Sequence, residues 1–160
     1  MPPAKSYSAL RAASLAVILL LGSCNAEEAA ADITLDRGWM RETRAGQSAG
    51  AGYLLIVNRG EGADRILGAS SPSAANVSLH STTHEDGIVR MRPLERAVVQ
   101  PRGVLSFTPG GNHVMLAGLK RPLAPGESIM LTLRFERSGE REIALRVTDA
   151  SADPSTAGLR

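Results

Sequence analysis

The stretch that decides the fold reads Ile129-Met130-Leu131-Thr132-Leu133-Arg134-Phe135, in which apolar side chains alternate with Met130, Thr132 and Arg134. Successive side chains of a β-strand point to opposite faces, so this alternation predicts a strand with one buried face and one wet face. The stretch Ile143–Val147 alternates in the same way. Both stretches therefore predict strands of a sheet whose one face packs on the core while the other face is exposed to solvent.

Outward from this stretch, short β-rich runs recur along the chain. Turn signals such as Asn58-Arg59-Gly60 and Pro109-Gly110-Gly111 separate them, and no long stretch shows a sustained period of 3.6 residues. Many short strands at roughly ten-residue spacing predict one all-β domain, an antiparallel Greek-key β-sandwich or barrel. The predicted strands cover residues 33–35, 53–57, 65–69, 77–81, 88–91, 104–108, 113–116, 129–135 and 143–147.

The N-terminal segment has the layout of a bacterial secretion signal. Two basic residues precede an apolar run over Ala12–Leu21, and Leu21-Gly22-Ser23-Cys24 then forms a lipobox. We expect cleavage before Cys24 and lipidation of its sulfur, which would anchor the protein to a membrane in the periplasm or on another extracytoplasmic face. The alternative is ordinary cleavage near Ala26 or within 29–31, which would release a soluble periplasmic protein. The expected organisation is a signal peptide over 1–23, a tether over 24–31, one domain over 32–148 and a flexible tail over 149–160.

Removal of the signal changes the charge balance of the chain. The 18 basic residues fall to 16, because Lys5 and Arg11 leave, against 16 acidic residues. A neutral domain with 3% aromatic residues gives no support for nucleic-acid binding, which needs a positive footprint. The only cysteine is Cys24, so the mature domain offers neither a disulfide nor a thiolate ligand.

Several other chemistries lack their motifs. No His-Glu-x-x-His helix motif occurs, and we do not expect an enzyme. Gly46, Gly50 and Gly52 lack the Lys-Ser/Thr of a phosphate-binding loop, and we interpret them as a flexible loop. For Trp39 and Tyr53 we expect packing in the core.

Four residues form a spaced set of soft and borderline metal ligands. His80 is followed after ten residues by Met91, and Met91 after twenty-one residues by His113 and Met115. Imidazole and thioether donors together suit copper, Cu(I) above all, whereas hard cations prefer oxygen. Thioethers also fit an oxidising compartment, in which paired thiols tend to form disulfides.

The strand periods place these ligands on shared faces. Period two puts His113 and Met115 on one face of 112–116, away from the core side chains of that strand. Asp86-Gly87 is a strong hairpin turn signal, and a two-residue turn there pairs Thr82 with Met91. His80 and His84 are then both diagonal neighbours of Met91. The register leaves open which of the two joins it.

The spacing resembles the signature of the PCuAC family of periplasmic copper chaperones. That signature is His or Met, ten residues, Met, twenty-one residues, then His-x-Met, and His80, Met91, His113 and Met115 match every position and both gaps. The similarity also includes Met91-Arg92-Pro93 and extends from about Ile33 to Val147. The resemblance implies a cupredoxin-like fold and a chaperone that binds one Cu(I) through these four residues. It further implies delivery to an apo copper protein, such as the CuA centre of cytochrome c oxidase subunit II, or to another copper chaperone.

Two departures from the family pattern affect the expected site. His84 stands where many relatives carry Met, and it is either a solvated side chain or an auxiliary ligand. Residues 148–160 contain neither His nor Met, so the Cu(II)-binding tail of some relatives is not expected. Two functions of other classes remain as alternatives: an electron-transfer cupredoxin, which would need a Cys ligand, and an Ig-like binding module without metal.

Overall fold

The computed structural model describes residues 29–149, and all regular structure in that range is β. The signal peptide, the lipobox with Cys24 and the tail from residue 150 lie outside the described residues. Within residues 29–149 no helix is long and apolar enough to cross a membrane. The strands are β1 (Ile33–Arg41), β2 (Ala49–Asn58), β3 (Asp64–Ser70), β4 (Ala74–Glu85), β5 (Ile88–Pro93), β6 (Val98–Val99), β7 (Val104–Phe107), β8 (Asn112–Leu119), β9 (Ser128–Phe135) and β10 (Glu140–Thr148).

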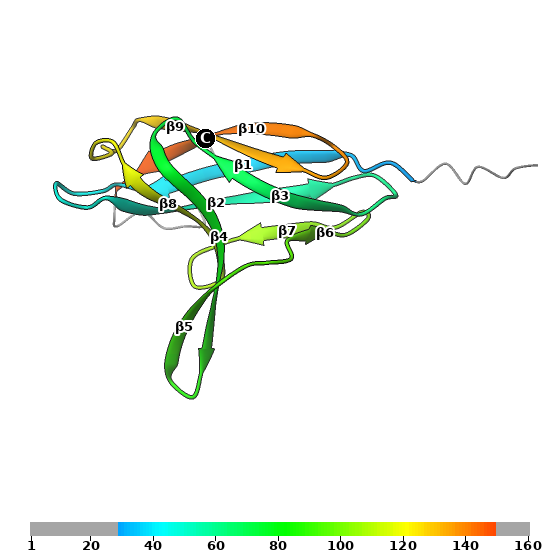
Figure 1. Cartoon of the computed structure of the whole chain (residues 1–160), viewed down its shortest axis with the longest axis horizontal. Coiled ribbons are helices and arrows are strands. Elements are labelled where there is room, and N and C mark those ends of the chain that lie inside the picture. Colours follow the sequence, from blue (N-terminus) through cyan, green and yellow to red (C-terminus); the bar gives the residue numbers. More distant parts are fainter. Residues whose placement is uncertain (1–28, 150–160) are drawn as a thin grey trace, which may run out of the picture.

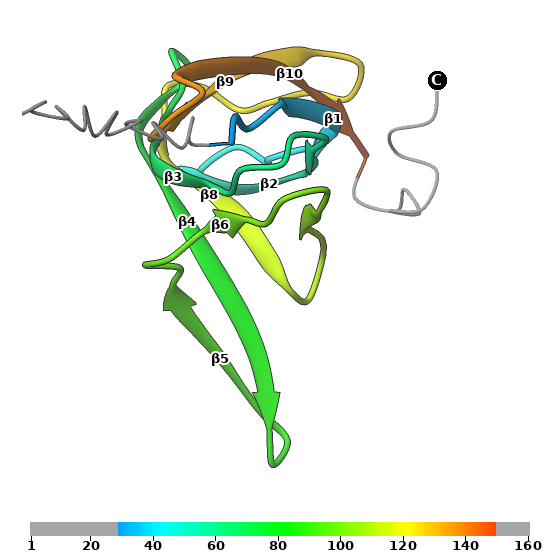
Figure 2. The same cartoon turned by 90° about the vertical axis from the view of Figure 1, so that its right-hand side faces the viewer.

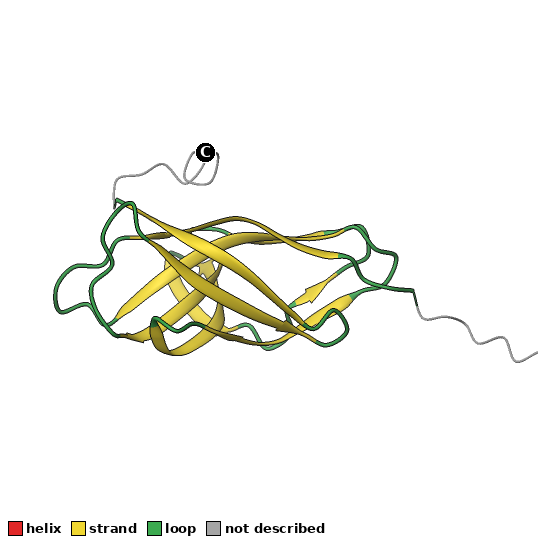
Figure 3. Ribbon diagram, turned by 90° about the horizontal axis from the view of Figure 1, so that it is seen from above, coloured by secondary structure: helices red, strands yellow, loops and turns green. Residues whose placement is uncertain are grey.

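The strands form one wrapped sheet in the order β5-β4-β8-β2-β1-β10-β9-β3-β6, and β7 pairs with β2. The described pairs are antiparallel, except that β1 and β10 run parallel. Figures 1 and 2 show an elongated body from which the β4–β5 hairpin projects. Seen from above, its strands cross over one another in two layers (Figure 3).

The all-β prediction is confirmed, and each of the nine predicted strands is present, most of them longer than expected. The additional strand β6 has only two residues, which is too short to produce an alternating pattern. In β9 the predicted faces are confirmed: Leu131 and Leu133 are 0% exposed, whereas Met130 between them is 41% exposed. Full burial of such a side chain stabilises the fold by about 1.5–3 kcal/mol before the entropy of ordering is counted.

The prediction of a flexible loop at the glycines is wrong for two of them. Gly50 and Gly52 lie inside β2, and only Gly46 lies in a turn, with a φ of 86°. The reason is close packing, since a Cβ on Gly52 would lie 2.8 Å from Cδ1 of Leu145. The glycine keeps β2 close to the core side chain of β10.

Trp39 and Tyr53 are buried and pack against each other, outside the main core cluster in which we expected them. They are 5% and 9% exposed, and their ring centroids lie 4.6 Å apart. The two residues lie opposite each other where β1 pairs with β2. The pair covers the outer surface of these strands beside β8.

The described end of the expected tether lies against the loop that follows β2. The backbone N–H of Gly62 donates to the carbonyl of Ala30 at 3.0 Å, and that of Arg59 donates to Asp32 at 2.9 Å. The Asp32 N–H in turn donates to Oδ1 of Asn58 at 3.0 Å. Chain entry into β1 is therefore fixed by three hydrogen bonds.

Candidate metal centre

The β4–β5 hairpin has the predicted turn and register. Asp86 and Gly87 have φ values of 51° and 75°, which is the backbone of a type I′ turn. Thr82 lies opposite Met91, as the two-residue turn requires. Because β5 is an edge strand with six exposed residues, Met91 is 55% exposed despite being a large apolar side chain.

The other side of β4 pairs with β8, and this pairing brings the two histidines together. His80 lies opposite His113, and Ser78 lies opposite Met115. Residues directly opposite one another in an antiparallel pair share a face. The two imidazole rings stack with centroids 5.8 Å apart and 23° between their planes.

His113 and Met115 share the face opposite the core, but His113 is more enclosed than the sequence indicated. Val114 and Leu116 are fully buried on the core side, as expected. His113 itself is only 5% exposed. The ring of His80 stacks on it from β4, so the outer face of β8 is covered at this position although it lies outside the core.

The hydrogen bonds of His113 determine which ring nitrogen is free. Its Nδ1 lies 3.2 Å from the carbonyl oxygen of Gly111. A carbonyl can only accept, so Nδ1 of the neutral ring carries the proton and Nε2 keeps its lone pair. That Nε2 is buried and has no hydrogen-bond partner among the described residues. A backbone carbonyl behind one nitrogen is the arrangement that orients a metal-binding histidine.

His80 shows the same asymmetry. Its Nε2 lies 2.9 Å from the hydroxyl oxygen of Ser78, two residues earlier on the same face of β4. Its Nδ1 is buried and lacks a hydrogen-bond partner within residues 29–149. An unpaired buried polar atom costs about 1–3 kcal/mol, so two such atoms on stacked rings require an explanation.

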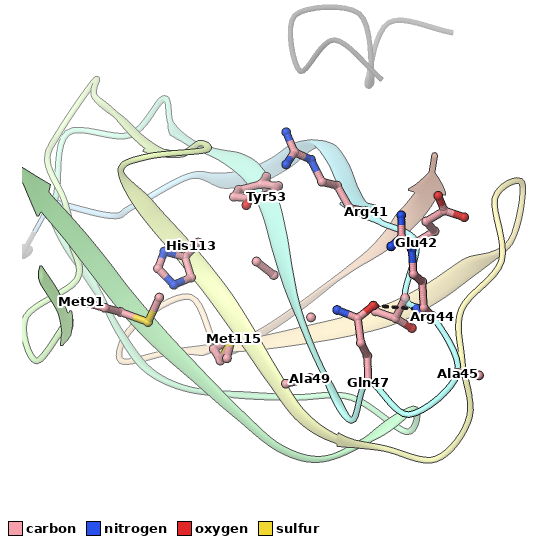
Figure 4. A pocket seen from close by; sticks show the side chains of 13 residues that line it. Arg41, Glu42, Arg44, Ala45, Gln47, Ala49, Tyr53, Met91, His113 and Met115 are labelled. Carbon is pink, nitrogen blue, oxygen red and sulfur yellow. Dashed lines mark hydrogen bonds between the residues drawn. The ribbon is translucent and has the colours of Figure 1, made fainter. Parts of the chain in front are cut away.

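Three of the four predicted ligands line one open cavity of about 730 Å³, namely Met91, His113 and Met115 (Figure 4). The fourth, His80, is joined to them through its stacked ring. His84 lies nearer the hairpin tip, where it is opposite Val89 in the register of the hairpin, and it is not among the residues that line this cavity. The complete cavity lining is Arg41, Glu42, Thr43, Arg44, Ala45, Gln47, Ala49, Gly50, Ala51, Tyr53, Met91, His113 and Met115.

The predicted donor set contains neither a carboxylate nor a thiolate. The described residues contain no group of three His, Cys, Asp or Glu side chains placed to hold a metal, so the set depends on its thioethers. Burial raises the pKa of the Tyr53 phenol, and the positive charge of Arg41 opposes that shift. Two imidazoles and two thioethers suit a soft, singly charged ion.

Two supporting residues were missed at the sequence level. Neither the hydroxyl of Ser78 nor the carbonyl of Gly111 was predicted to contact a ligand. Ser78 could have been found, because residues two apart in a strand share a face. The contact with the Gly111 carbonyl could not have been found in this way, because it is a backbone contact and the pattern of side chains does not predict it.

Comparison with known proteins finds a matching family model and a similar full-length relative. The family model described as "Putative lipoprotein LpqE-like" matches residues 33–147. The chain is 32% identical to "Putative lipoprotein Lxx21020" of Leifsonia xyli subsp. xyli, over 92% of this chain and 94% of that protein.

Solved structures with the same fold include two copper-loaded proteins. One is the copper-bound PCuAC domain from PmoF2, with a TM-score of 0.62 and 26% identity over 75% of this chain and 96% of that domain. The other is the solution structure of Cu(I)-DR1885 from Deinococcus radiodurans, with a TM-score of 0.60 and 27% identity over 79% of this chain and 85% of that one. The predicted cupredoxin-like β-sandwich is thereby confirmed.

Proposed function

Because this chain belongs to the LpqE-like family of lipoproteins and shares its fold with copper-loaded PCuAC domains, we propose that it is an extracytoplasmic copper chaperone. In this proposal it binds one Cu(I) ion through His80, Met91, His113 and Met115. The imidazole donors are Nδ1 of His80 and Nε2 of His113.

The main support for this proposal is the pair of ring nitrogens that lack a partner among the described residues, Nδ1 of His80 and Nε2 of His113. Each ring uses its other nitrogen in a hydrogen bond, and the remaining nitrogen is buried without a partner in the described chain. With Nε2 of His80 donating to the Ser78 hydroxyl, Nδ1 carries a lone pair, and a cation between the two rings would then pair both buried nitrogens. The thioethers of Met91 and Met115 would complete a soft donor set, which favours Cu(I) over Cu(II) and over hard ions.

Unequal exposure of the ligands suits a carrier better than a permanent metal site. His113 is 5% exposed, whereas Met91 is 55% exposed on a projecting edge strand. Exchange of the ion with an acceptor would begin at Met91, because an incoming ligand can reach the copper there. The acceptor that we propose is the apo CuA centre of cytochrome c oxidase subunit II, or else another copper chaperone.

The cellular location follows from the N-terminal lipobox. Similarity to lipoproteins over almost the whole chain supports a lipid on Cys24. The lipid would hold the domain at the extracytoplasmic face of a membrane, in the periplasm if the cell has one. In that compartment Met ligands are more durable Cu(I) donors than paired thiols.

A transfer assay tests the function directly. Purified Cu(I)-loaded protein is mixed with an apo CuA domain, and the acceptor's metal content and absorption are followed after separation. We expect colourless Cu(I) binding and then loss of copper to the acceptor. Intense blue colour on Cu(II) addition would instead indicate an electron-transfer cupredoxin, and no copper uptake would indicate a binding module without metal. The His113→Ala/Met115→Ala variant is the matched control, which should neither load nor transfer.

A further inference from the structure

The cavity beside the proposed ligands is larger than a copper ion requires. It measures about 730 Å³, within the range of sites that bind small organic molecules. Its floor lies on the outer face of β2 and β8, where Ala51 lies opposite Met115 and Ala49 lies opposite Ala117. Because the side chains at 49, 51 and 117 are single methyl groups, the sheet surface is hollow next to Met115.

The end of the cavity away from the ligands is positively charged. Figure 4 shows Met91, His113 and Met115 on one side of the cavity and Arg44 with Gln47 on the other, while the side chain of Arg41 extends upward above Tyr53. Arg41 and Arg44 take no part in the ion pairs Arg65–Glu136, Arg90–Glu85, Arg102–Glu61 and Arg121–Glu127. Glu42 is the only carboxylate in the lining, and it has an interaction of its own.

The wall that carries these arginines is held in place by the rest of the fold. The Thr43 N–H donates to the Leu123 carbonyl at 3.0 Å, and the Leu123 N–H donates back to Oγ1 of Thr43 at 2.9 Å. The Glu42 N–H donates to the carbonyl of Thr148 at 2.7 Å. The Arg44 N–H donates to Oε1 of Gln47 at 2.7 Å, which closes the turn. The cavity is therefore preformed, which lowers the entropic cost of filling it.

We propose that this cavity binds a small organic acid, with its carboxylates on the guanidinium groups of Arg41 and Arg44 and its carbon skeleton on the alanine floor. Guanidinium groups match the planar geometry of a carboxylate. The methyl groups of Ala49 and Ala51 and the thioether of Met115 give the floor an apolar surface. That surface favours an organic acid over a bare inorganic anion.

A bound carboxylate would also affect the metal site. Four neutral ligands leave the charge of Cu(I) uncompensated, and an anion in the adjoining cavity would offset it. Binding of the acid and of Cu(I) should then strengthen one another by the same factor, as linkage requires. This coupling rests on the proposed function, whereas binding of the acid to the metal-free protein does not.

Citrate titration of the metal-free mature protein, followed by backbone amide NMR at constant ionic strength, tests the proposal. We expect saturable shifts at Arg44, Ala49 and Ala51. Arg41→Gln and Arg44→Gln should each weaken the apparent affinity at least fivefold. Ala49→Leu, which fills the floor without changing the charge, should weaken it similarly. Arg65→Gln is the matched control, because Arg65 pairs with Glu136 and lies outside the cavity lining.

Four results would overturn the proposal. They are the absence of saturable shifts, equal weakening by Arg65→Gln, inorganic phosphate binding as tightly as citrate, and binding of an acidic peptide but of no small acid. The same citrate titration of Cu(I)-loaded protein measures the coupling between acid binding and Cu(I) binding. If citrate binds the metal-free protein and copper does not bind at all, the copper proposal fails and the cavity proposal stands.

Discussion

The imidazole rings of His80 and His113 stack across β4 and β8 with their centroids 5.8 Å apart, and each ring keeps one buried nitrogen unpaired within the described chain. Their strand register makes the two residues direct cross-strand partners, although 32 residues separate them along the chain. A backbone carbonyl and a serine hydroxyl occupy the opposite nitrogens. The free nitrogens are therefore fixed by the fold before any metal arrives.

Replacement of His113 by Ala should abolish most Cu(I) binding. We expect the affinity to fall at least tenfold in competition with a Cu(I) chelator, since a fixed imidazole donor is lost. The ring is 5% exposed, so the free energy of unfolding should also fall, by about 1–2 kcal/mol in urea titrations of the metal-free protein. Unchanged copper affinity in His113→Ala/Met115→Ala would refute the ligand assignment.

The roles of the two β4 histidines can be separated by paired variants. His80→Ala should lower equilibrium Cu(I) affinity clearly, because its ring stacks on His113 and its Nδ1 has no hydrogen-bond partner among residues 29–149. His84→Ala should leave that affinity nearly unchanged, while delivery to an acceptor becomes slower. Chelator competition at one pH measures the first effect, and stopped-flow transfer measures the second. A larger loss of affinity in His84→Ala than in His80→Ala would show that the ligand set is wrong at this position.

Met91→Leu should separate copper binding from stability. Leu has a similar volume but no sulfur, and the site is 55% exposed, so the free energy of unfolding should change by less than about 0.5 kcal/mol. Cu(I) affinity should fall at least tenfold. Met130→Leu is the matched control, because Met130 is 41% exposed on β9 outside the cavity lining. Equal copper affinities in the two variants would remove Met91 from the site.

Lipidation of Cys24 is tested by metabolic labelling with a fatty acid. The mature protein should carry the label and fractionate with membranes, and Cys24→Ala should lose both properties. The lipobox 21–24 motivates the prediction, and similarity to lipoproteins supports it. Unlabelled protein in the soluble extracytoplasmic fraction would favour ordinary signal cleavage instead.

Asp64 should make the domain sensitive to acid. Burial raises the pKa of its carboxyl, but hydrogen bonds from Ser138, Arg137 and Arg65 outweigh burial and leave that pKa below its ordinary value. A lowered folded-state pKa contributes stability that is present above the unfolded pKa of about 3.9 and is lost as the pH falls through the folded value.

The measurement is the free energy of unfolding of wild type and Asp64→Asn between pH 7 and pH 2. At pH 7 the variant should be less stable by about 1–3 kcal/mol, because charged hydrogen bonds are lost. That difference should shrink below about pH 3.9. A difference independent of pH would show that the ionised carboxylate is not the stabilising form.

Local patterns in the sequence predicted most of the strands and the register of the β4–β5 hairpin. The alternation in 129–135 determines which face of β9 is buried. Side chains of a strand point to alternate faces whatever the distant contacts are, so the local sequence is enough to predict this face. Asp86-Gly87 sets the hairpin register because a type I′ turn requires positive φ at both central residues. The four-ligand set itself came from a family resemblance in the spacing, and it stays a prediction.

Local sequence patterns could not predict the interactions between segments that lie far apart in the chain. The two glycines in β2 were mistaken for a loop, because only the packing of Leu145 from β10 shows why Gly52 has no side chain. The parallel pairing of β1 with β10 joins the two ends of the domain, and no turn signal encodes such a pairing. The short β6 depends on pairing with β3 rather than on its own two residues.

The sequence by itself determined where nine of the strands lie, which face of β9 is apolar, and that imidazole and thioether donors recur at fixed spacing. Only the tertiary structure decided that His80 stacks on His113, that one nitrogen of each ring lacks a partner in the part of the chain that the structure describes, and that a cavity lined by two arginines adjoins Met115. The physical reason is distance along the chain. Side-chain direction follows from the local backbone, whereas burial and hydrogen-bond partners depend on strands that meet only when the whole sheet has closed.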